Sequence, residues 1–245
     1  VVAENLTPLE GAEEEVGILG LFMEEKLGLS VVTVKGTAAT EGDLRAGVAK
    51  PHVLHIATHG LYLPSAVETV PERAREAPFV PKEVAGFQNP MFGSCLALAG
   101  SSDTVAAWSK GVVPDPESDG LLMANEVAEL DLAGTLLVAL SACDTASGEA
   151  TKGDGVLGLR RGFRMAGAEN VISTLWPISD AATVAIMRQF YEGLAVSPPS
   201  TSLSATQREW LVKLRDKPTP AEDDPLPVNG FYWAVNLAGP FLLGR

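Results

Sequence analysis

The sequence predicts an α/β fold in which helices cover both faces of a mostly parallel sheet. Three observations support this prediction. Segments with helical spacing of apolar residues alternate with short apolar strands along the chain. Most of these strands are apolar throughout, which is typical of strands buried on both faces. Two of them end in small-residue turns that hold reactive side chains, and open parallel sheets place their sites at such ends.

The first half of the chain is expected to contain two helices and three strands. Apolar residues three or four apart indicate the helices, and Gly28 ends the first one. Runs of β-branched and aliphatic residues indicate strands, and stretches rich in proline, glycine and charge indicate loops. The expected elements are helices over 9–27 and 40–48, strands over 31–34, 53–57 and 95–99, and irregular loops over 62–92 and 101–119.

The second half repeats the alternation. Asp154 and Asp180 each stand where a helix N-cap is expected, and Gly167 follows the first of these helices. The expected elements are helices over 121–130, 154–165, 180–194 and 204–213, strands over 135–140, 170–176 and 231–237, and loops or linkers over 147–152, 197–200 and 218–227.

Composition excludes several classes of function. The 245 residues are 46% apolar, as expected for a globular chain, and 18 basic against 31 acidic residues give a net charge of −13. This charge argues against nucleic acid or an anionic membrane as a partner. The apolar runs are shorter than a membrane span needs, and two cysteines make no disulfide framework. We expect a cytoplasmic chain without metal or cofactor, cut from a longer protein because it begins without Met.

Two short segments carry the chemistry. The segment LHIATHG (residues 54–60) places His59 after a buried strand, and LVALSACDT (residues 137–145) places Cys143 after another. A cysteine and a histidine at matching strand ends predict a cysteine-nucleophile hydrolase. Cys143 would attack an amide carbonyl and His59 would protonate the leaving amine. The N–H groups of Gly60 and Cys143 would hold the oxyanion.

Each of these side chains also has a structural interpretation. A strand-end cysteine can be a small apolar side chain, and a strand-end histidine can be a packing residue. His55 is expected to be a hydrogen-bonded core histidine, and Cys95 an inert buried thiol. Asp144 can orient the site or bond the amides of its turn.

Asp180 and Trp176 follow the strand expected to neighbour the Cys143 strand. Asp180 can cap its helix or line the pocket for the substrate residue before the cut. Trp176 can form a wall of the same pocket or pack in the core.

At these residues the sequence resembles the CHAT domain family, caspase-like cysteine peptidases of clan CD that are related to separase. The resemblance covers nearly the whole chain, so we treat residues 1–245 as a single domain. It is carried by LHIATHG, LVALSACDT, GVLGLRRGFRMAGAENVISTLWPISD (residues 155–180) and YWAVNLAG (residues 232–239), in the family's order and spacing. Residues 67–87 and 218–227 match nothing in the family pattern.

The resemblance implies a caspase-like three-layer sandwich with a catalytic dyad of His59 and Cys143. It also implies that Trp176 and Asp180 match the separase stretch that supplies an acid to the pocket for a basic residue. Family members often follow tetratricopeptide repeats and cut a partner protein in bacterial defence or signalling. The expected function is therefore a regulated cysteine endopeptidase, with a protein substrate and an upstream repeat region or sensor as partners. The alternatives are a catalytically silent scaffold and a redox-sensing thiol at Cys143.

Overall fold

In this computed structural model, the described residues form a central sheet of four strands in the order β1-β5-β6-β7. The structure describes residue 6 and residues 9–47, 50–63, 89–141, 154–174, 180–215 and 241–244. The strands are β1 (Val53–Ala57), β5 (Leu137–Ser141), β6 (Val171–Thr174) and β7 (Phe241–Gly244). The first three are parallel and β7 is antiparallel to β6, which confirms the predicted mostly parallel sheet.

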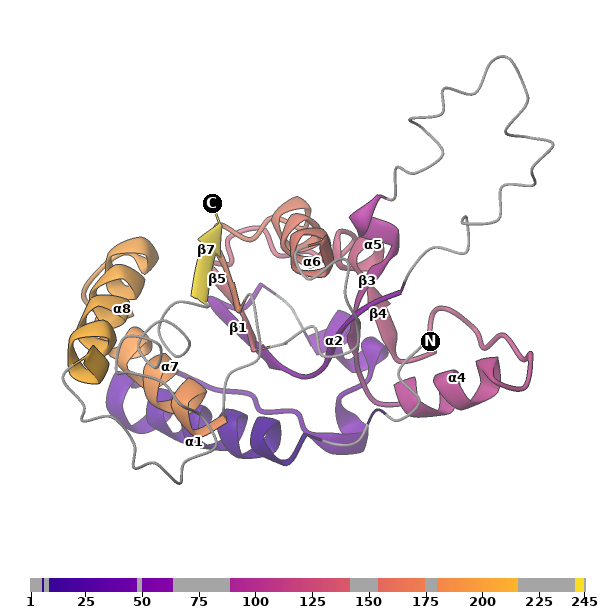
Figure 1. Cartoon of the computed structure of the whole chain (residues 1–245), viewed down its shortest axis with the longest axis horizontal. Coiled ribbons are helices and arrows are strands. Elements are labelled where there is room, and N and C mark those ends of the chain that lie inside the picture. The colour runs from indigo at the N-terminus through magenta and orange to yellow at the C-terminus, as the bar shows by residue number, and fades with distance from the viewer. Residues whose placement is uncertain are drawn as a thin grey trace, which may run out of the picture.

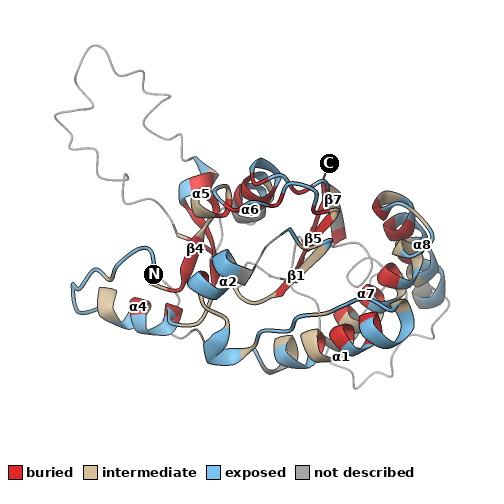
Figure 2. Cartoon of the chain, turned by 180° about the vertical axis from the view of Figure 1, so that it is seen from behind, coloured by how far each residue is buried: buried red, intermediate tan, exposed pale blue. Residues whose placement is uncertain are grey.

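Helices lie on both faces of this sheet, so the fold has three layers (Figure 1). Alternation along β5 sends Val138 and Leu140 to one face, where they pack with Phe163 of α6 (Asp154–Met165). Leu137 and Ala139 face the other side, where they pack with α1 (Glu10–Leu27) and α7 (Asp180–Leu194). The last helix, α8 (Pro199–Arg215), packs on the outside of α7. Figure 2 shows the buried residues gathered on the strands and on the inward sides of the helices.

A second sheet, absent from the sequence expectation, follows β1 directly. It is antiparallel, in the order β2-β3-β4, with β2 (Gly60–Tyr62), β3 (Ser94–Ala97) and β4 (Leu121–Met123). The short helix α5 (Ala124–Val127) follows β4, and the 3-10 turn η3 (Pro90–Phe92) precedes β3. Both pack against α6, which therefore joins the two sheets into one core.

Three expected elements are wrong. Residues 31–34 form no strand, because the segment runs back beside α1, where Val31 and Thr33 lie next to Gly20. The expected loop over 101–119 begins with a helix, α4 (Ser101–Trp108), before it becomes irregular. The expected helix over 121–130 is divided into β4 and α5, because β4 pairs with β3.

The remaining helices and strands that the structure describes agree with the expectation within a few residues. The first helix ends at Gly28 in the left-handed conformation, with φ of 65°. The helix α2 (Glu41–Gly47) and the 3-10 turn η1 (Gly36–Ala38) precede β1. Helix α8 begins at Pro199, earlier than expected, as proline at a first helical turn permits. The strand expected over 231–237, the loops expected over 147–152 and 218–227, and most of the loop expected over 62–92 lie outside the described residues.

Candidate active site

His59 lies at the junction of the two sheets. It follows Thr58 after the carboxyl end of β1 and immediately precedes β2. The N–H of Thr58 donates to the carbonyl oxygen of Ser141 at 3.2 Å, and the carbonyl oxygen of His59 accepts from the N–H of Ala97 at 2.9 Å. The Thr58 hydroxyl also donates to the carbonyl oxygen of Ala97. The backbone around His59 is therefore held by β5 of one sheet and by β3 of the other.

The N–H of Gly60 points away from its neighbouring strand. Gly60 is opposite Leu96 in the antiparallel β2–β3 pair, and the bond from Ala97 N to His59 O flanks this pair. In such a ladder the residues at a non-hydrogen-bonded pair direct their own N–H and C=O groups to the outer side. Because β2 is the edge strand of its sheet, the Gly60 N–H faces away from the ladder, next to His59.

The strand that leads to Cys143 is the direct neighbour of the strand that leads to His59. Ala57, the last residue of β1, is in parallel register with Ser141, the last residue of β5. His59 comes two residues after Ala57, and Cys143 comes two residues after Ser141. Parallel neighbours end at the same edge of a sheet, so β1 and β5 both end at this edge.

The other predicted site residues fall mostly outside the described part of the chain. Cys143, Asp144 and Trp176 are not among the described residues. Asp180 is the first residue of α7, and its side chain is likewise not described. Of the predicted site, the structure thus places His59 and Gly60 directly.

A buried hydrogen-bonded network lies beneath this edge, and we call it the Glu15 network. It consists of Glu15 of α1, His55 of β1, Ser141 of β5 and Tyr191 of α7. The ring nitrogens of His55 lie 2.8 Å from the Tyr191 hydroxyl and 3.0 Å from Glu15 Oε1, and the Ser141 hydroxyl donates to Glu15 Oε2 at 2.9 Å. His55 is therefore a hydrogen-bonded core histidine, as the sequence predicted.

The network satisfies its polar groups in one consistent arrangement. Burial, and then the charge of Glu15, raise the pKa of Tyr191, so this hydroxyl keeps its proton. Tyr191 can then donate to Nδ1 of His55, which leaves the imidazole proton on Nε2, directed at Glu15. The Glu15 carboxylate thus accepts from two donors although it is only 3% exposed.

Sequence reasoning identified His55 but missed Glu15, Ser141 and Tyr191. A signal for Glu15 was present, because it precedes the buried Leu19 by four residues and so lies on the apolar stripe of α1. A carboxylate at such a position needs a buried partner.

A separate group of carboxyls lies where α2 meets the start of β4. Burial raises the pKa of Glu41, Asp119 and Glu126. Glu41 accepts from the Gly120 N–H at 2.7 Å, and Arg45 forms an ion pair with Glu126 at 3.3 Å. These contacts fix the turn into β4.

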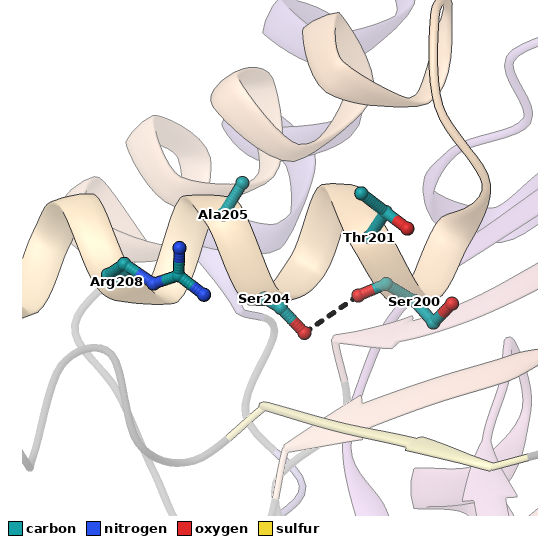
Figure 3. A pocket seen from close by; sticks show the side chains of 5 residues that line it. All are labelled: Ser200, Thr201, Ser204, Ala205 and Arg208. Carbon is teal, nitrogen blue, oxygen red and sulfur yellow. Dashed lines mark hydrogen bonds between the residues drawn. The ribbon is translucent and has the colours of Figure 1, made fainter.

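Two hollows of the described surface lie on α7 and α8, and the larger, of about 650 Å³, lies between these two helices. An open hollow of about 340 Å³ lies on α8, lined by Ser200, Thr201, Ser204, Ala205 and Arg208 (Figure 3). The Ser204 hydroxyl there donates to the carbonyl oxygen of Ser200, within the same helix. Among the described residues, no three His, Cys, Asp or Glu side chains gather as metal ligands would, and no helix is long and apolar enough to span a membrane.

The fold and its strand edge define a three-layer α/β domain of caspase-like type, with a histidine at the carboxyl end of a central strand. The model of the CHAT domain family matches residues 3–244, and the chain belongs to this family, which is related to caspase-like cysteine peptidases.

Two similar proteins are tetratricopeptide repeat proteins. The chain is 30% identical over 189 residues to tetratricopeptide repeat protein 28 of Mus musculus and 29% identical over 187 residues to that of Homo sapiens. Each match covers 76% of this chain but 7% of the relative, so the chain spans a small part of these proteins.

Proposed function

We propose that this chain is a cysteine endopeptidase domain that cleaves a partner protein with Cys143 as the nucleophile and His59 as the proton donor. The observation that carries the proposal is the parallel pairing of β1 with β5, with Ala57 opposite Ser141. It directs the segments that hold His59 and Cys143 to one edge of the sheet. Membership of the CHAT domain family supports the same conclusion.

The reaction proceeds in two steps. Cys143 Sγ attacks the peptide carbonyl, and the negative charge on its oxygen is held by the N–H groups of Gly60 and Cys143. The carbon–nitrogen bond breaks, and the thiol proton passes through His59 to the leaving amine. Water then hydrolyses the thioester, which releases the acid fragment and restores the thiol. The outward direction of the Gly60 N–H fits this role because the β2–β3 ladder does not use it.

Asp180, Trp176 and Asp144 would shape the pocket for the substrate. Asp180 begins α7, directly after the segment that follows β6, and β6 is the neighbour of β5. An acid in this place would favour a basic residue before the cut, with Trp176 as a wall and Asp144 as an orienting group. If Asp180 instead caps α7, the residue before the cut is unconstrained by charge.

The proposed setting is a cytoplasmic signalling or defence protein of bacterial type. The two relatives carry tetratricopeptide repeats in their names, which supports an upstream repeat region as the regulatory partner. The peptidase would act once that region or a sensor orders the site.

Cleavage by the full-length protein tests the proposal. Wild type is incubated with proteins encoded by neighbouring genes, alongside Cys143→Ala, His59→Ala and the control His52→Ala, whose histidine is exposed. Mass spectrometry identifies the fragments. One specific cut in wild type and His52→Ala, lost in the other two variants, is the expected result. A cut that survives Cys143→Ala, or no cut by wild type under any activating condition, contradicts the proposal and favours the silent scaffold.

A further inference from the structure

Ser141 is the residue at which the two proposed catalytic segments meet. Its carbonyl oxygen accepts from the N–H of Thr58, the residue before His59. Cys143 comes two residues after it in the chain. Its hydroxyl donates to Glu15 Oε2 at 2.9 Å, so a side chain of α1 fixes this point of the sheet from below.

Glu15 is in turn held by a second strand of the same edge. Its other oxygen lies 3.0 Å from His55 Nε2, in β1, and His55 is anchored by Tyr191 at 2.8 Å. The single carboxylate therefore contacts both β1 and β5, the strands that lead to His59 and Cys143. Each of its contacts is directional, because a hydrogen bond weakens steeply away from linear geometry.

Stability alone does not account for a carboxylate in this place. Apolar side chains of the same shape can replace both partners of a buried hydrogen bond with little loss of stability. A buried polar network fixes one arrangement of its neighbours, and catalysis needs such fixation, since a misplacement of about 1 Å can lower a rate roughly a hundredfold.

We propose that Glu15 is a positioning residue that acts through Ser141 and His55 to hold His59 and Cys143 in reactive geometry. The inference rests on the proposed peptidase function. It makes α1 a part of the catalytic apparatus without contact with the substrate.

The rate of Cys143 alkylation by iodoacetamide tests this inference without a known substrate. A histidine beside a cysteine raises the thiolate fraction of the cysteine. The alkylation rate of His59→Ala is therefore the reference for a Cys143 thiol without a histidine partner. The other thiol, Cys95, is fully buried, and mass spectrometry assigns the adduct. Ser141→Ala removes the tie to Glu15, whereas Ser141→Thr keeps the hydroxyl.

A matched control removes a serine hydroxyl elsewhere. Ser202 is 2% exposed and donates to the carbonyl oxygen of Phe190 at 2.6 Å, on the α7–α8 side of the molecule. Ser202→Ala thus deletes a buried hydrogen bond of the same kind. Comparing its Tm with that of Ser141→Ala separates a loss of stability from a loss of positioning.

The expected result is that Ser141→Ala alkylates about tenfold or more slowly than wild type, as slowly as His59→Ala. Ser141→Thr and Ser202→Ala should stay within about twofold of wild type. A wild-type rate in Ser141→Ala overturns the positioning role and leaves the dyad intact. Equal rates in wild type and His59→Ala also overturn this inference, whereas the proposed function is tested separately by the loss of cleavage in Cys143→Ala.

A second variant keeps the inference testable if Ser141→Ala does not fold. Glu15→Leu fills similar space without an acceptor for Ser141 or His55. It should show the same slow alkylation, and a wild-type rate in the folded variant overturns the positioning role.

Discussion

Replacing His55 with leucine should destabilise the fold strongly although no catalytic residue changes. The substitution removes both bonds of the ring, at 2.8 Å to Tyr191 and at 3.0 Å to Glu15. It leaves the Tyr191 hydroxyl without this partner, and Ser141 remains as the partner of the Glu15 carboxylate among the described residues. A buried polar group left short of a hydrogen-bond partner costs about 1–3 kcal/mol, and more when it is charged, so the two groups together cost about 3–5 kcal/mol. For a domain of this size that corresponds to a fall in Tm of roughly 6–20 °C.

The assay is urea unfolding followed by tryptophan fluorescence, and His52→Leu is the matched control. His52 is exposed and precedes β1, so the same substitution there should change the free energy of unfolding by no more than about 0.5 kcal/mol. The double variant Glu15→Met/His55→Leu removes the charge together with its partner. The double variant should lose about 2 kcal/mol less unfolding free energy than the two single variants lose in total. If the losses of unfolding free energy were additive, or if His55→Leu lost less than about 1 kcal/mol, His55 and Glu15 would not stabilise the fold as a coupled pair.

Three further predictions concern packing, pH and specificity. Gly162→Ala should destabilise the fold by about 1–3 kcal/mol because its Cβ would lie 2.4 Å from the Ala124 carbonyl oxygen. Gly17→Ala meets only the tip of a lysine side chain and should stabilise α1 by about 0.5–1 kcal/mol. Urea unfolding measures both free energies, and equal effects of the two substitutions would contradict the packing. Burial raises the pKa of Glu41 from 4.5, so its contribution to stability is full below pH 4.5 and is lost as the pH rises through the raised value. Glu41→Gln should reduce this fall in unfolding free energy with rising pH. If the free energy of the variant fell as steeply with pH as that of wild type, Glu41 would not be the group responsible. Asp180→Ala should lower cleavage after Lys or Arg by about tenfold or more if the acid lines the pocket, as fragment mass spectrometry would show, and should leave it unchanged if the acid only caps α7.

The long elements could be predicted because their patterns are local. The apolar stripe of α1 and the uniformly apolar β5 carry their own evidence of burial, and both were placed correctly. The strand predicted over residues 31–34 is wrong because a run of β-branched residues looks the same whether it pairs with a strand or packs on a helix. The helix predicted over residues 121–130 is wrong because β4 pairs with β3, which lies far from it in the chain, and this pairing overrides the helical pattern.

The candidate site also contains residues that a local motif predicts and residues that only the tertiary packing reveals. The position of His59 at a strand end follows from the motif itself, and the structure adds that its strand is next to β5. The Glu15 network could not be derived from local pattern. Its bonds join residues 40 and 136 positions apart in the chain, and only the packing of α1 and α7 on one face brings them together.

A covalent acyl-enzyme on Cys143 would distinguish a cysteine peptidase from a silent scaffold. A peptide that spans the identified cut is mixed with the full-length protein, the reaction is stopped in acid, and intact mass is measured. We expect wild type to gain the mass of the acyl fragment, on Cys143, as a thioester. An acyl adduct that persists in Cys143→Ala, or turnover of the peptide by wild type without any adduct on Cys143, would contradict it.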